Sequence, residues 1–554
     1  MAPIAPRVAF AIRPRYLLRV RPFKLPLPIA LGLPLLVFLL LAWKLNFLTD
    51  DAFISFRYTQ NWVAGHGLRY NLGSEMPVEG YSNFLWVLMM APFEAWGMSL
   101  GGASRLLSGL SGLILCFCVT RHARRRFDLD NVGTLACGLF FASLPCTALW
   151  ATGGLATMPA ALLTFCMYER LLGDPEAPRG RAAGIFGALA VLMRADGFLW
   201  AAMILFGAGL AWFWSRRDQR LLREALWCTG IIVLVSAGHF LWRHSYYGEW
   251  LPNTARVKAG FSTFRLERGW AYLAQWWLTM PALFVVLVLS IWRIPNALRA
   301  PLVVSLTVAL GAQAYALWIG GDFMPFGRLM FAAVPFIALL FAALWSRLSQ
   351  DKSGTSPAAL GLGALLILSN LLGCFGVSLV PDSVRSRFHF RLSNTWQSEM
   401  DMRSSMIERT QSWELLGRAL ALFTQPQDSI VLSGIGAIGY HSRLQIHDLY
   451  GLVSPEVLKD TQPLKKASPG HDRAVLSSFF LDQHPTLGGA FIAPANAPPN
   501  HGMPPGWEQT PFSKLLRLER HPLPVEQNFP PGLELRMLVY KAWPKVGRER
   551  VKSQ

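Results

Sequence analysis

Two adjacent carboxylates, Asp50 and Asp51, follow directly after the first long apolar segment of the chain, residues 27–48. A charge pair at that boundary is expected at the membrane surface, where ionisable groups are costly to keep and tend to be functional. In sugar transfer, one carboxylate can take the proton of an acceptor hydroxyl as that hydroxyl attacks the anomeric carbon. The simpler alternative is helix capping, for which a single Asp would serve. The pair therefore favours catalysis, with one of the two carboxylates as the base and its partner, or a metal, orienting the acceptor.

Further candidate ligands lie in the same loop, residues 49–83, and in later turns expected at the same membrane face. They are polar groups that could hold a sugar or a phosphate: Arg57, Glu79, Tyr81, Asn83, Arg194, Asp196, Asn253, Lys258, Asp322 and Arg328. Lys258 and its neighbour Arg256, held outside against the positive-inside bias, suggest an anionic ligand such as a polyprenyl phosphate, with lipid headgroups as the alternative.

Several of these residues have an equally plain structural interpretation. Arg57 follows Asp50 by about two helical turns and shares its face, so a salt bridge competes with ligand binding. Arg194 and Asp196 could neutralise each other where a helix breaks, and the same alternative applies to Asp322 with Arg328.

The composition identifies the class of protein that must position these groups. The chain has 554 residues, of which 53% are hydrophobic and 15% are charged, against roughly 25% charged residues in soluble domains. Apolar runs recur between residues 27 and 380. The net charge of +19 comes from arginine clusters between these runs, which indicate positive-inside topology rather than nucleic-acid binding. The seven cysteines show no spacing typical of a disulfide framework or a zinc site.

The charge pattern predicts a topology. Residues 1–26 are basic and are expected in the cytoplasm, so the first helix delivers the loop 49–83 to the outer face. Residues 84–96 are too short for a span of about 20 residues and are interpreted as an interfacial or re-entrant helix. About eleven crossings are then expected from the arginine clusters that separate the apolar segments: 27–48, 103–120, 132–148, 159–172, 183–192, 198–214, 226–242, 280–292, 301–319, 329–345 and 357–380.

Residues 381–554 form a polar tail that the topology places in the periplasm. Residues 429–432 and 444–446 are predicted strands, and the glycine-rich run 434–439 between them favours a small α/β unit. Tight strand-to-helix packing explains these glycines better than a dinucleotide fingerprint, because the G-x-G-x-x-G spacing is absent. The expected fold is thus a polytopic α-helical membrane protein, residues 27–380, with a C-terminal periplasmic α/β domain.

A set of motifs, in chain order, resembles the GT-C glycosyltransferases. The nearest branch is the terminal arabinofuranosyltransferase-like proteins of mycobacteria and their relatives in Gram-negative bacteria. The resemblance rests on Asp50-Asp51-Ala52-Phe53-Ile54, residues 79–83, Trp150-Ala151-Thr152-Gly153-Gly154-Leu155, Arg194-x-Asp196-Gly197, Pro252-Asn253-Thr254 and residues 321–325, and in the tail on residues 436–440, Asp448 and residues 451–453.

The resemblance implies an inverting glycosyltransferase in a bacterial inner membrane. It implies a polyprenyl-phosphate sugar donor, a periplasmic active site with Asp50 as general base, and a glycan or protein acceptor. One residue departs from the family pattern: Ala156 stands where a Glu is usual. The sequence therefore assigns no cofactor, since it allows a divalent metal but does not indicate one. Transfer of a hexose or aminosugar, a lipid-linked sugar transporter and a non-catalytic scaffold remain as alternatives.

Overall fold

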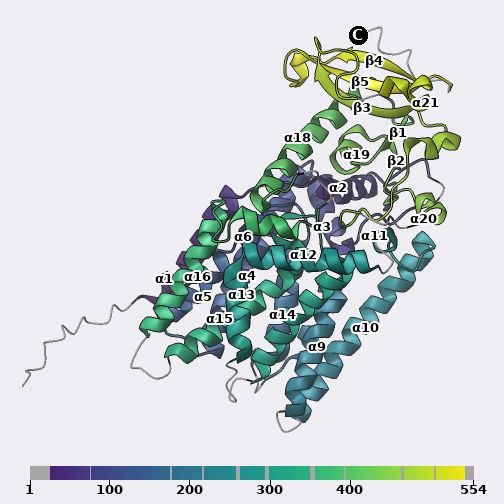
Figure 1. Ribbon diagram of the computed structural model, residues 1–554. Coiled ribbons are helices and arrows are strands. Elements are labelled where there is room, and N and C mark those ends of the chain that lie inside the picture. The colour runs from purple at the N-terminus through teal and green to yellow at the C-terminus, as the bar shows by residue number, and fades with distance from the viewer. Residues whose placement is uncertain are drawn as a thin grey trace, which may run out of the picture.

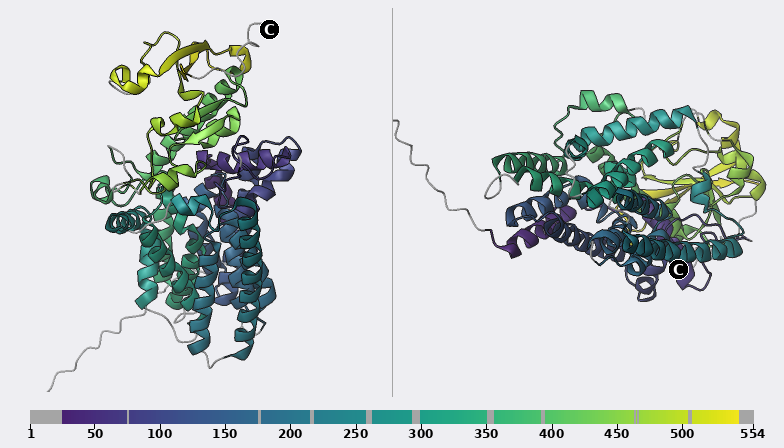
Figure 2. Two further views of the ribbon diagram at one scale, coloured as in Figure 1. Left: turned by 90° about the vertical axis from the view of Figure 1, so that its right-hand side faces the viewer. Right: turned by 90° about the horizontal axis from the view of Figure 1, so that it is seen from below.

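The computed structural model describes residues 25–542 except for the short stretches 75, 175–176, 215–217, 258–261, 293–298, 350–355, 392–394, 463, 465–466 and 504–506. A bundle of apolar helices makes up one end of the molecule, and a small mixed sheet makes up the other (Figure 1). The two views of Figure 2 show that the loops and short helices between these parts lie at one end of the bundle.

Each predicted crossing contains a helix, although the helices differ in length. They are α1 (Leu27–Lys44), α4 (Leu100–Arg126), α5 (Asn131–Ala142), α7 (Thr157–Leu172), α8 (Gly180–Met193), α9 (Gly197–Trp214), α10 (Gln219–Tyr247), α13 (Pro281–Trp292), α14 (Arg299–Ile319), α15 (Val334–Ser349) and α16 (Pro357–Cys374).

Among the described residues, seven helices are long and apolar enough to cross a membrane. The number rises to eight if α12 (Thr263–Thr279) and α13, which are bent by 98°, form one span. This confirms a multi-pass membrane protein. The count of about eleven stays a prediction, because α5 and α8 are short apolar helices and α7 has 16 residues, fewer than the roughly 20 of a full span.

Burial separates the central helix of the bundle from its periphery. The span that contains α15 is 89% buried, whereas that of α10 is 11% buried. Apolar side chains on α10, such as Leu234 and Leu241, are exposed. An all-round apolar helix with an exposed surface is typical of contact with lipid.

The loop 49–83 begins with a helix, α2 (Asp50–Val63), followed by coil and then the short apolar helix α3 (Phe84–Ala95). Thr49 is the N-cap of α2, and its hydroxyl accepts from the amide of Asp51 at 3.1 Å. Because Thr49 supplies the cap, neither Asp50 nor Asp51 is needed for that purpose, and both lie in the first helical turn. Other short elements at this end are α6 (Pro145–Trp150), α11 (Asn253–Val257) and η2 (Pro325–Ala333).

The tail is an α/β unit, as predicted. Within its described residues, five strands have the order β2-β1-β3-β5-β4, with β1 (Ser429–Leu432) parallel to β2 (Gln445–Asp448) and to β3 (Leu487–Pro494). The strands β4 (Leu516–Pro522) and β5 (Leu533–Tyr540) complete the sheet in antiparallel pairing. β1 and β2 confirm the two predicted strands, while the other three were not predicted. The tail's remaining elements are α17 (Asp382–Arg385), η3 (Ser386–Phe388), α18 (Glu399–Phe423), α19 (Gly436–Ser442), α20 (Glu456–Asp460), η4 (Ser477–Gln483), η5 (Trp507–Gln509), α21 (Pro511–Lys514) and η6 (Val525–Gln527).

The hydrophobic core is continuous between the tail and the loop that carries the two acids. One cluster of buried residues joins Ile54 and Tyr58 of α2 to Ile435 and Ile446 of the tail. The helix α18 runs from the bundle to the sheet (Figure 1), and its residues Met402 and Met406 belong to the core of the bundle. The tail is therefore packed directly onto the first loop.

Candidate active site

A cavity of about 1250 Å³ lies where the loop 49–83, the later turns and the tail meet. Segments near residues 155, 195, 255 and 322 all contribute to its lining. The turns expected at one membrane face thus come together at one end of the bundle. Eight of the predicted site residues line the cavity: Asp50, Asp51, Tyr81, Asn83, Arg194, Asp196, Asp322 and Arg328.

Asp50 is held by the tail. Its carboxylate accepts hydrogen bonds from the backbone amides of Gly436, at 3.2 Å, and Ala437, at 2.6 Å. Burial raises the pKa of Asp50 to about 7, and the charge of Asp51 adds to this effect, while the two amides and the charge of Arg409 oppose it. A carboxylate with a pKa near 7 can both accept and release a proton at neutral pH.

Asp51 has a different environment from its neighbour. Its side chain is 37% exposed, and its carboxylate lies 3.8 Å from the guanidinium of Arg328. A pair that is open to water to this extent contributes little to stability. Asp51 is therefore the more accessible of the two acids.

The turn between α8 and α9 presents a tightly paired arginine to the cavity. Arg194 donates to both carboxylate oxygens of Asp196, at 2.9 and 2.7 Å, and reaches the hydroxyl of Thr157 at 3.4 Å. This ion pair lies at the break between α8 and α9, so Arg194 and Asp196 neutralise each other there, as their structural interpretation expected. Arg194 also lines the cavity, so binding of a ligand is compatible with the same geometry.

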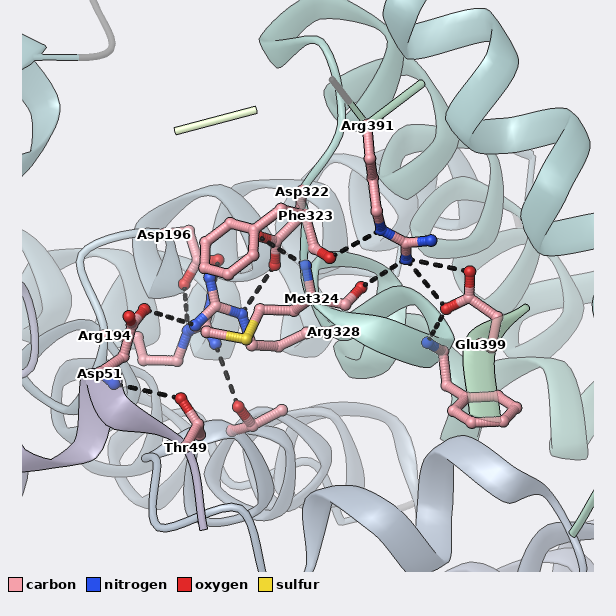
Figure 3. A network of polar contacts seen from close by, with 12 residues as sticks. Thr49, Asp51, Arg194, Asp196, Asp322, Phe323, Met324, Arg328, Arg391 and Glu399 are labelled. Carbon is pink, nitrogen blue, oxygen red and sulfur yellow. Dashed lines mark hydrogen bonds and ion pairs between the residues drawn. The ribbon is translucent and has the colours of Figure 1, made fainter. Parts of the chain in front are cut away.

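A chain of polar contacts extends from Asp51 across the cavity to the start of α18 (Figure 3). The Nε of Arg328 donates to Asp322 at 2.7 Å. Arg391 donates to the carbonyl of Phe323 at 2.9 Å and to both oxygens of Glu399, at 2.9 and 3.1 Å. These contacts fix the turn 321–328 against the tail.

Two polar residues of the loop's end also line the cavity. The hydroxyl of Tyr81 lies 3.0 Å from that of Tyr247, and Asn83 exchanges hydrogen bonds with Ser55 of α2. Both are buried, so they shape the cavity wall beside the two acids.

Three predicted ligands do not line the cavity, because each has a structural partner elsewhere. Arg57 donates to the carbonyls of Tyr70, Gly439 and Leu444, at 2.8, 2.8 and 2.6 Å. The carboxylate of Glu79 lies 2.7 Å from Arg243, and burial raises its pKa to about 7. Asn253 donates to the carbonyls of the tail's residues 451 and 452. The remaining predicted ligand, Lys258, lies outside the described residues.

The chain is similar in sequence to a known enzyme. The chain is 26% identical over 344 residues to the terminal beta-(1->2)-arabinofuranosyltransferase of Corynebacterium glutamicum, covering 54% of this chain. The chain spans about half, 48%, of the length of that protein. A family model described as a domain of unknown function, DUF8728, matches residues 401–521, from α18 to β4.

Two solved structures share the architecture. ArnT from Cupriavidus metallidurans bound to undecaprenyl phosphate has a TM-score of 0.53 at 13% identity, covering 93% of this chain and 99% of ArnT. The apo oligosaccharyltransferase of Archaeoglobus fulgidus has a TM-score of 0.50 at 12% identity, covering 85% and 69%. This chain has the GT-C glycosyltransferase fold.

The tail adds cavity residues that the sequence did not reveal. Arg409 and Trp413 come from α18, and Tyr450 follows β2. Within the described part of the chain, Arg409 has no ion pair with a carboxylate, and its guanidinium lies 5.9 Å from the ring of Trp413. In the sequence, the indication nearest to Tyr450 was the family resemblance of Asp448 and residues 451–453.

The described acidic side chains of the cavity do not gather into a metal site. Among the residues that the structure describes, no group of three or more His, Cys, Asp or Glu side chains is arranged as a metal site. Ala156, which replaces the usual Glu, is buried in the cavity wall and offers no ligand atom there.

Proposed function

We propose that this chain is an inverting glycosyltransferase of a bacterial inner membrane, with its active site at the periplasmic face. It transfers a sugar from a polyprenyl-phosphate donor to a glycan or protein acceptor. The observation that carries the proposal is the position of Asp50. Its carboxylate, with a pKa raised to about 7, lines a large cavity at one end of an apolar helix bundle.

Asp50 is the proposed general base. An ionised carboxylate has about four lone-pair sites, so the two amide bonds leave room to accept a proton from an acceptor hydroxyl. The hydroxyl oxygen forms a bond to the anomeric carbon while the bond between that carbon and the phosphate oxygen breaks. The proton moves to Asp50, and the electron pair leaves with the polyprenyl phosphate. Attack opposite to the leaving group inverts the anomeric centre.

The arginines of the bundle are the proposed partners of the donor phosphate. Arg194 and Arg328 line the cavity on the turns after α8 and α14, and a guanidinium can bind a phosphate with two parallel donors. Asp196 and Asp322 hold these guanidinium groups in place. Lys258, by its place in the sequence, is proposed to add a third cation. The ArnT structure, bound to undecaprenyl phosphate, supports a donor of this class.

The proposed sugar is arabinofuranose, which the name of the Corynebacterium glutamicum relative supports. The tail is proposed to hold the acceptor, because its residues Arg409, Trp413 and Tyr450 line the same cavity as Asp50. Aromatic rings and a guanidinium together offer stacking faces and hydrogen-bond donors to a saccharide.

The decisive experiment measures sugar transfer by purified variants in proteoliposomes that contain the polyprenyl-phosphate donor. Asp50→Asn removes the base while preserving the size of the side chain, and transfer is expected to fall by about 10²–10⁴-fold. Asp51→Asn is the matched neighbour and is expected to lose much less. Full activity of Asp50→Asn at wild-type membrane level would rule out the base assignment.

The substrates are identified by mass spectrometry of envelope glycans and lipid-linked sugars in a deletion strain. Loss of one sugar residue from one polymer, with accumulation of its polyprenyl-phosphate donor, would identify both the donor and the acceptor. A deletion strain with unchanged glycans and unchanged lipid-linked sugars would contradict the proposed transfer.

A further inference from the structure

Two features of the sequence, the glycine-rich run 434–439 and Arg57, find a common explanation in the contact between α2 and α19. One face of α2 carries Asp50, Phe53 and Arg57, which follow one another at intervals of three and four residues. All three side chains contact the segment that contains α19. We call this set of contacts the α2–α19 clasp.

Asp50 and Arg57 bind α19 and the residues just after it at successive points. At the beginning of the helix, the amides of Gly436 and Ala437 donate to Asp50. In its middle, the carbonyl of Gly439 accepts from Arg57, whose guanidinium also donates to the carbonyl of Leu444, two residues past the end of the helix. Between them, the ring of Phe53 lies 5.5 Å from that of Tyr440.

The close fit at positions 436 and 439 leaves no room for a side chain. A Cβ atom at position 436 would stand 2.0 Å from the carbonyl oxygen of Asp50 and 2.6 Å from its carboxylate. A Cβ atom at position 439 would stand 2.0 Å from the hydroxyl of Tyr70 and 2.8 Å from the guanidinium of Arg57. Atoms essentially never approach a Cβ that closely, so these glycines allow the backbone of α19 to lie directly on α2.

We propose that the clasp makes the C-terminal unit a working part of the active site, with the backbone amides of Gly436 and Ala437 positioning the carboxylate of Asp50 for proton transfer. The proposal rests on the proposed function of Asp50 and deepens it. Gly436 and Ala437 are positioning residues, because they act through Asp50 and form no part of the reacting groups.

The electrostatics around Asp50 agree with this role. Burial raises its pKa, and the amide of Ala437 is the largest opposing influence. The other groups that act on Asp50 are Asp51 on α2 and Arg409 on α18, while Tyr70 lies near enough to interact with its charge. Loss of the Ala437 amide would remove a hydrogen bond to the ionised form, so the pKa of Asp50 would rise further.

The substitution Ala437→Pro tests the proposal because it deletes the N–H group that donates to Asp50 at 2.6 Å. Position 437 lies in the first turn of α19, where an amide has no partner within the helix and proline is tolerated. The acid limb of the pH profile of kcat is expected to move up by roughly one pH unit. At pH 7, kcat falls while the KM for the donor changes little. Ala437→Ser, which keeps the N–H group, is expected to keep the acid limb of the unmodified enzyme.

A second variant guards against misfolding of the proline variant. Gly436→Ala places a methyl group against the backbone of Asp50 and is expected to lower kcat in the same way. If both variants transfer sugar with the unmodified kcat and acid limb, the amides do not position the base and the proposal is overturned.

Hydrogen exchange in nanodiscs separates this proposal from the proposed function. The amides of Gly436 and Ala437 are expected to exchange faster in Asp50→Ala than in Asp51→Ala, whether or not transfer is detected. Equal exchange in the two variants would overturn the clasp. The expected difference in a chain that transfers no sugar would instead sustain the contact and reject the enzymatic role.

Discussion

The cavity has two sides that fix their charged groups by different means. On the side of the helix bundle, each predicted arginine has a carboxylate partner, Asp196 for Arg194 and Asp322 for Arg328. On the side of the tail, the acids Asp50 and Asp448 are held by backbone amides. Burial raises the pKa of Asp448 to about 6, as it raises that of Asp50 to about 7.

The difference teaches how one cavity can hold both an anion and a movable proton. An arginine paired with a carboxylate stays charged, and its position is fixed before a ligand arrives. An acid held by neutral amides keeps its own charge uncompensated, so burial moves its pKa towards neutrality. The bundle side is thus suited to hold a phosphate, and the tail side to handle a proton.

The largest effect is expected from replacing Arg57, which holds the segment with α19 against α2. Arg57→Met removes three hydrogen bonds from a buried guanidinium, and each bond to a charged group contributes about 1.5–3 kcal/mol. We expect the free energy of opening between α2 and α19 to fall by at least about 3 kcal/mol, measured by hydrogen exchange of residues 436–446. Arg69→Met, which removes a single bond within the loop, is the control. Unchanged exchange in Arg57→Met would show that the clasp does not depend on this residue.

On the bundle side, a double-mutant cycle at Arg194 and Asp196 sharpens the comparison. Removing one partner of a buried pair leaves an uncompensated charge and typically costs about 3–5 kcal/mol. Arg194→Ala is therefore expected to lower the free energy of unfolding more than Arg194→Ala combined with Asp196→Ala does. Denaturant unfolding in detergent measures both. Additive losses would mean that the two side chains do not act as a pair.

The smallest effect concerns pH. A base must be ionised to accept a proton, and the pKa of Asp50 is raised to about 7. Below that pH the ionised fraction, and with it kcat, is expected to fall about tenfold per pH unit, or about 1.4 kcal/mol. The loss occurs as pH decreases, because protonation removes the active form. A pH–rate profile that stays flat between pH 5 and pH 8 would contradict the assignment.

The class of protein and the end of the bundle that carries the site followed from local patterns. Apolar runs and arginine clusters predicted the crossing segments, and the turns carrying Asp51, Arg194 and Asp322 were expected on one face and do line one cavity. The same-face relation of Asp50 and Arg57 follows from helical periodicity. The contact of both residues with α19 could not be predicted, because α19 lies more than 370 residues away in the chain, as the bond from Arg57 to Gly439 shows.

The sequence by itself determined the fold class, the two parallel strands that open the tail's sheet and the pair of acids that follows the first apolar helix, because hydrophobicity, charge and turn residues act over short stretches of chain. Only the tertiary structure decided that Asp50 and Asp51 differ, that Arg57 binds carbonyls instead of a ligand, and that Arg409 and Tyr450 reach the cavity. Those outcomes depend on which distant backbone groups pack against each side chain, and on the burial that this packing produces. Neither can be read from neighbouring residues.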